Sequence, residues 1–243
     1  MDDRDEFERY NAENHPGFSR TGDQYRLTAA DRFALRTLER PDTELLALTR
    51  KDTGQLVVTS GRLAVFDPLW PMEQWSDPLD LTVPNGAHDA YILTCEAGKW
   101  GECNAMFVVT FEGAQPVEWT AASFASSLKY APDEPTHLIY VDAGTIGLGD
   151  LSSIDNLRNI VKRRIEAGEI GDEGDQLGEM NEQYDLVAQD YRVGDGPDNL
   201  LFIGTGIGDG GYPIYWGLAS NGEPAALVVS FYLLEARFRK NLQ

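Results

Sequence analysis

Apolar and polar positions alternate differently along the chain, and the change divides the sequence into an arm and a domain. Residues 1–28 are polar and charged without a regular apolar period, which predicts a polar N-terminal arm. Apolar residues then recur at helical spacing after Thr28, which is expected to cap a helix that ends at Pro41. From Gln55 onwards, most apolar residues fall in short strand-like runs. The pattern therefore predicts a single domain over residues 29–243, preceded by the arm.

The strand-like runs follow one another with turns between them. Asn221 and Gly222 between two apolar runs form a strong hairpin signal. Strands that follow one another without crossover helices pair antiparallel. The expected fold class is therefore α+β, with a large, mainly antiparallel β-sheet and a few packed helices. The expected strands cover residues 55–60, 62–66, 79–83, 90–94, 105–111, 137–142, 199–203, 212–219 and 224–233.

Helices and ordered loops are expected between these strands. A short helix is predicted over residues 120–129, and Ser152 or Ser153 is expected to cap a second helix that runs to about Ala167. Residues 67–78 carry three prolines and two tryptophans, which predicts an ordered loop.

The chain is strongly acidic, with a formal net charge of -20. Residues 166–198 contain eleven acidic side chains and one basic one, Arg192. The glycines at positions 168, 171, 174 and 178 argue against a continuous helix there, so a solvated loop with one helix over residues 177–189 is expected.

This charge narrows the range of partners. Phosphate backbones and anionic membranes repel such a surface, so we expect neither a nucleic-acid nor a membrane partner. A basic protein partner would be attracted. The alternative is that the charge only keeps the chain soluble. The first residues, Met1 to Glu6, lack the basic and apolar stretches of a signal peptide, so a cytoplasmic location is expected.

Cys95 and Cys103 are the only cysteines. A hairpin could bring them together as a disulfide, whereas a reducing compartment would keep two thiols, which is the expected state in the cytoplasm. With three scattered histidines they show no spacing typical of a zinc site.

Two glycine-rich segments, residues 144–149 and 204–211, are expected to form turns at strand ends. If the two turns lie at the same end of one sheet, Asp142, Asp150 and Asp209 would converge. Such a cluster could bind a divalent cation or serve acid–base chemistry, although no cofactor is predicted. The alternative is that each aspartate hydrogen-bonds its own turn, or that Asp150 caps the following helix.

A dinucleotide site is not expected at the second of these turns. Gly206, Gly208 and Gly211 match the spacing of the dinucleotide fingerprint. The fingerprint requires a helix directly after the glycines, and the residues that follow here are β-prone.

Four segments together resemble the bacterial family called domain of unknown function 4241. The resemblance covers about residues 55–233 and implies a soluble bacterial protein without an established activity. It singles out Asp67, Asp142, Asp209 and Tyr212, and the candidate binding residues are Asp67, Gly208, Asp209, Gly210 and Tyr212. The segments are residues 60–69 (SGRLAVFDPL), 117–122 (VEWTAA), 141–144 (VDAG) and 208–217 (GDGGYPIYWG).

Three functions fit these observations. The first is a protein-binding module that neutralises a basic partner, as an immunity protein neutralises a toxin. The second is a hydrolase-like enzyme that uses Asp142, Asp150 and Asp209 as catalytic candidates with a divalent cation. The third is a protein in which these motifs serve folding alone.

Overall fold

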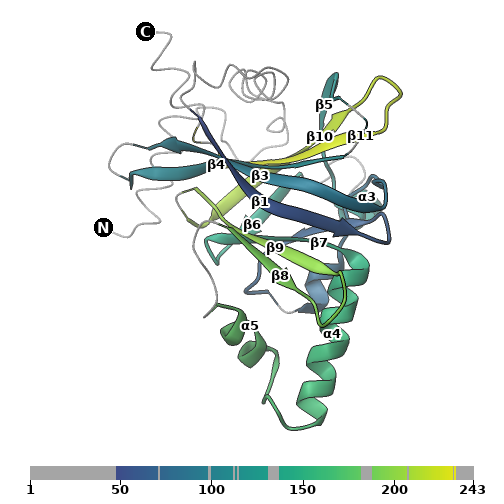
Figure 1. Ribbon diagram of the computed structural model, residues 1–243, viewed down its shortest axis with the longest axis vertical. Helices are drawn as coiled ribbons and strands as arrows, with labels where there is room; N and C mark the ends of the chain where they lie inside the picture. Colours follow the sequence, from purple (N-terminus) through teal and green to yellow (C-terminus); the bar gives the residue numbers. More distant parts are fainter. Residues whose placement is uncertain are drawn as a thin grey trace.

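The computed structural model describes residues 48–70, 72–97, 100–111, 113, 115–130, 137–181, 188–206, 208–231 and 233. The expected arm over residues 1–28 and the helix after Thr28 lie outside this part of the chain. Two β-sheets stack on each other in the described part, and helices cover the outer face of the smaller sheet (Figure 1). The expected α+β class is confirmed, with the strands divided between two sheets instead of one.

The larger sheet has seven strands in the order β1-β3-β4-β11-β10-β5, and β6 pairs with the remaining part of β10. The smaller sheet has the order β2-β7-β9-β8. All described pairings between these strands are antiparallel. The strands are β1 (Thr49–Val58), β2 (Leu63–Phe66), β3 (Gly86–Glu96), β4 (Glu102–Thr110), β5 (Glu118–Ala121), β6 (Leu138–Val141), β7 (Thr145–Asp150), β8 (Ala188–Arg192), β9 (Asn199–Gly204), β10 (Gly210–Leu218) and β11 (Pro224–Ser230).

The main core lies between the two sheets. Side chains on a strand alternate between its two faces, so alternate residues of most strands reach this layer. Ile146 and Leu148 of β7 and Ile214 and Trp216 of β10 pack in this layer. These four side chains are fully buried. Side chains at such positions stabilise the fold by about 1.5–3 kcal/mol each.

The described helices are η2 (Met72–Ser76), α3 (Ala125–Tyr130), α4 (Leu151–Glu166) and α5 (Glu173–Asn181). The longest, α4, packs its apolar stripe of Ile154, Leu157 and Val161 on the outer face of the smaller sheet. Asp150 caps its N-terminus, as one of the two alternatives for this residue predicted. Within the described residues, no helix is both long and apolar enough to cross a membrane.

Several segments differ from the expectation. Residues 79–83 form no regular strand, since only isolated bridges from Leu79 to Phe124 and from Arg62 to Thr82 are present there. The acidic stretch forms α5 earlier than expected and then contributes β8, which was not predicted. Residues 145–150 form strand β7 and not a turn.

The glycines of β7 have a packing role. A Cβ atom added to Gly147 would lie 2.2 Å from the ring of Phe66, and one added to Gly149 would lie 2.2 Å from Leu200. Real Cβ atoms essentially never approach so closely, so only glycine lets the large side chains beneath α4 close over this strand. The sequence predicted that these glycines form a turn, whereas they allow close packing around a strand.

Candidate functional site

The reversal after β6 and the reversal between β9 and β10 lie next to each other. β7 starts opposite the end of β9, with Thr145 paired to Gly204, and β10 starts opposite the end of β6, with Gly210 paired to Val141. The two turns therefore meet at the same end of the strands. The condition for a shared aspartate site, that the two turns are neighbours, is met, and we call residues 142–144 together with residues 205, 206, 208 and 209 the turn junction.

Main-chain and side-chain hydrogen bonds tie the two turns together. The N–H of Gly144 donates to Oδ1 of Asp209 at 3.0 Å, and the N–H of Thr205 donates to the carbonyl of Gly144 at 2.9 Å. Gly144 has a φ of +58°, and a Cβ atom at this position would lie 3.7 Å from the Cα of Gly208. Asp209 is exposed, yet it acts here as a clamp across the junction.

Asp67 lies outside the junction and binds the backbone of its first turn. The Asp67 residue is fully buried, and its carboxylate accepts the N–H of Leu69 through Oδ1 at 2.7 Å and the N–H of Asp142 through Oδ2 at 2.5 Å. Burial raises the pKa of this carboxyl, while its bonds to main-chain N–H groups act in the opposite direction. Both oxygens hold the backbone, so the geometry assigns Asp67 to positioning the first turn.

Tyr212 supports the second turn in the same way. Its ring is buried edge-on against Phe231, and its hydroxyl donates to the carbonyl of Gly208 at 2.5 Å. The hydroxyl of Thr205 donates to the same carbonyl at 2.5 Å. Burial raises the pKa of Tyr212 well above its ordinary value, so its hydroxyl keeps its proton. Gly208, with a φ of +115°, supplies the backbone conformation that this closed turn needs.

Asp150 does not join these residues. It lies at the opposite end of the six-residue strand β7, about 16 Å from the junction at the usual rise per strand residue. Its buried carboxylate accepts the N–H of Ser152 at 3.0 Å and the N–H of Ser60 at 3.0 Å. The expected convergence of Asp142, Asp150 and Asp209 is therefore wrong, because β7 is a strand that separates Asp150 from the other two.

No group of three or more His, Cys, Asp or Glu side chains in the described residues is arranged to hold a metal ion. A dinucleotide fingerprint needs a helix after its glycines, but here strand β10 begins at Gly210. The carboxylates of Asp67 and Asp209 are used as hydrogen-bond acceptors for main-chain N–H groups. At the junction these carboxylates therefore fix the backbone conformation of the turns.

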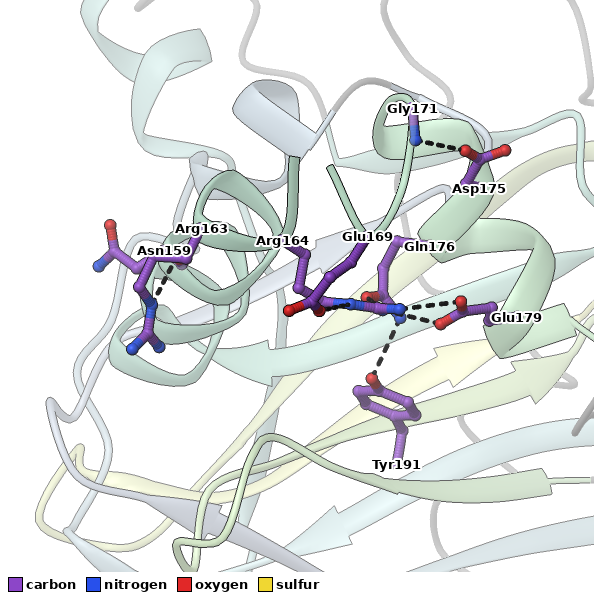
Figure 2. A network of polar contacts seen from close by, with 9 residues as sticks. All are labelled: Asn159, Arg163, Arg164, Glu169, Gly171, Asp175, Gln176, Glu179 and Tyr191. Atoms are coloured by element: carbon purple, nitrogen blue, oxygen red, sulfur yellow. Dashed lines mark hydrogen bonds and ion pairs between the residues drawn. The ribbon is translucent and has the colours of Figure 1, made fainter. Parts of the chain in front are cut away.

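A second polar cluster was not predicted, and it joins α4 to α5 (Figure 2). Arg164 donates from Nη1 to Oε2 of Glu179 at 2.7 Å and from Nη2 to Oε1 of the same residue at 2.9 Å. It also bonds to Gln176 at 2.5 Å and lies 3.5 Å from Glu169. The pKa of Glu179 is lowered chiefly by its hydrogen bonds to Arg164. The run of basic residues 162–164 ahead of the acidic stretch was the sequence signal that could have revealed it.

Near this cluster, a groove of about 620 Å³ runs along α4. None of the candidate residues of the turn junction lines it. Its rim carries both signs of charge, and its lining residues are Asp155, Arg158, Asn159, Val161, Lys162, Ile165, Glu166 and Glu173.

A sequence model of the family described as "Protein of unknown function (DUF4241)" matches residues 56–229. The match contains the turn junction, Asp67, Tyr212 and the Arg164 cluster. No curated protein and no solved structure matches the chain.

Proposed function

Because the chain belongs to the DUF4241 family, whose description names no activity, we propose a function from the charge of its surface: the chain is a protein-binding module that binds a basic protein. Such a partner would be neutralised as a toxin is by its immunity protein. The proposed contact region is the acidic lobe, which we define as residues 166–181. These residues comprise the end of α4, the following loop and α5.

The charge of the acidic lobe is one-sided. Residues 166–181 contain six acidic side chains and no basic one. All six of these residues are exposed: Glu166, Glu169, Asp172, Glu173, Asp175 and Glu179. Arg164 pairs with Glu169 and Glu179, whereas no basic side chain of the described residues pairs with Asp172, Glu173 or Asp175. These three carboxylates are available to a cationic partner.

The acidic lobe is held in one place, and this observation carries the proposal. Ile170 and Met180 are buried in the core beneath α4, and Gln176 is buried beside Arg164. The N–H of Met72 donates to Glu173 at 3.1 Å, which ties α5 to η2. Carboxylates on a fixed surface cost less to order on binding than those of a mobile chain. They also steer a basic protein during its approach.

A triple variant tests the role of these carboxylates: Asp172→Asn, Glu173→Gln and Asp175→Asn. Each replacement keeps a side-chain oxygen for the main-chain N–H groups that the native residue binds: Gly174 and Asp175 for residue 172, Met72 for residue 173 and Gly171 for residue 175. The lobe should keep its fold while losing three charges. The control removes the same charge from the larger sheet and its β10–β11 turn through Glu96→Gln, Glu118→Gln and Glu223→Gln, all at exposed positions.

The wild-type chain and both triple variants are immobilised and exposed to lysate of the source cell, and the retained proteins are identified by mass spectrometry. We expect a basic protein that the wild type and the control retain and the lobe variant loses. With that protein purified, the lobe variant should associate about tenfold more slowly at low ionic strength, and its rate should depend less on salt. Retention of no basic protein, or equal weakening by both variants, would contradict the proposal.

A further inference from the structure

The two cysteines lie directly opposite each other on neighbouring strands. In the pairing of β3 with β4, Cys95 is the register partner of Cys103, next to the pair Glu96 and Glu102. Directly opposed residues of antiparallel strands have Cα atoms about 4.5 or 5.5 Å apart, and their side chains point to the same face. Both separations lie within the range of about 4.4–6.8 Å that disulfides span. The backbone spacing expected for such register partners is therefore compatible with a disulfide.

Both thiols lie in an apolar cluster on the face of the larger sheet that is turned away from the smaller sheet. Cys95 is 3% exposed and Cys103 is 9% exposed. The thiol of Cys103 donates to the carbonyl of Trp100 at 3.7 Å, at the end of the hairpin. Cys103 is therefore the cysteine that a small reagent would reach first.

We propose that Cys95 and Cys103 form a dithiol pair that a small disulfide oxidant closes into a cross-strand disulfide. The Cys103 thiolate attacks one sulfur of oxidised glutathione and releases one glutathione thiolate. The Cys95 thiolate then attacks the Cys103 sulfur of the mixed disulfide and releases the second glutathione. Two cysteine thiols and one oxidised glutathione thus give one protein disulfide and two reduced glutathione molecules, which take up the two protons.

The surroundings of the pair make this reaction slow at neutral pH. Burial raises the pKa of the Cys103 thiol, and the carboxylates of Glu96 and Glu102 act in the same direction. The attacking species is the thiolate, so the rate should rise about tenfold for each pH unit below that pKa. The pair is thus suited to sustained oxidation and not to rapid turnover.

The native protein, incubated with oxidised and reduced glutathione in varied ratios, is alkylated under denaturing conditions and measured by intact mass spectrometry. We expect a species that has lost two hydrogens and takes up no alkylating reagent, with a peptide that links Cys95 to Cys103. This closure should raise Tm by about 5–10 °C, because the cross-link closes a loop and lowers the conformational entropy of the unfolded chain. Dithiothreitol should reverse both changes.

Two single variants identify the order of attack. Cys95→Ala should accumulate a stable glutathione adduct at Cys103, because the resolving thiol is missing. Cys103→Ala should react several-fold more slowly, because only the less exposed Cys95 remains. The proposal would be overturned if both cysteines of the wild-type chain were fully alkylated at every ratio of oxidised to reduced glutathione, or if a glutathione adduct persisted on that chain. These outcomes do not depend on whether the acidic lobe binds a basic protein.

Discussion

The turn junction and the acidic lobe both contain several carboxylates, but these groups serve different purposes. At the turn junction, Asp67 and Asp209 accept main-chain N–H groups from turns that are distant in sequence. In the acidic lobe, Asp172 and Asp175 accept N–H groups only within their own loop and helix, and they stay exposed. The difference indicates that the carboxylates at the junction join backbone segments distant in sequence, whereas those of the lobe are exposed to solvent.

The two regions also use glycine differently. Beside the junction, Gly147 is needed because a side chain would collide with Phe66. In the lobe, Gly178 has open space around it, since no atom lies within 4 Å of an added Cβ. The same substitution to alanine should therefore have opposite effects in the two regions.

The largest expected effect is that of Gly147→Ala. Phe66 cannot move aside, because its ring is stacked on Trp75 with centroids 4.3 Å apart and meets Phe202 edge-on. Overpacking of this kind should lower the free energy of unfolding by about 3 kcal/mol, measured by urea denaturation. A loss below about 0.5 kcal/mol would mean that β7 is not packed as described.

Asp67→Asn should have the next largest effect. Both oxygens of Asp67 accept main-chain N–H groups, and an amide nitrogen cannot replace either of them. One of the two N–H groups would lose its acceptor and face the buried amide nitrogen of the new side chain, which should reduce the free energy of unfolding by about 2 kcal/mol.

Asp209→Asn is the matched control for this substitution. Asp209 is exposed and accepts the N–H of Gly144 through a single oxygen, which an amide oxygen can replace. The Asp209→Asn variant should lose less than about 0.5 kcal/mol of the free energy of unfolding. Equal losses at the two positions would show that the junction does not depend on the buried carboxylate.

The residues explain which parts of the fold could be predicted from the sequence. The strands β4, β9 and β10 follow apolar runs that are bounded by turn residues, and local pattern sufficed for them. β7 was misassigned because Gly147 and Gly149 resemble turn residues, although Ile146 and Leu148 alternate with them at the period of a strand. Only the positions of Phe66 and Leu200 in space reveal why the glycines are there.

α5 shows the limit of local propensity. Its glycines argue against a helix, yet the bidentate pair of Arg164 with Glu179 and the burial of Met180 hold it in place. These contacts connect separate elements and leave no periodic signal. At the candidate site, the two turns are neighbours, which the sequence had offered only as a condition for a shared aspartate site. The role of Asp150 depended on the length of β7, which the glycines concealed.

A small gain of stability in the lobe is expected from Gly178→Ala. Gly178 lies within α5 at an exposed position, and an added Cβ would meet no atom within 4 Å. Alanine restricts the unfolded chain and favours the helix, by about 0.5–1 kcal/mol. Because a lobe can open without global unfolding, the most direct measurement is amide hydrogen exchange in α5, which should slow about two- to fivefold. Unchanged or faster exchange would show that α5 is not the stable helix on which the display of its carboxylates depends.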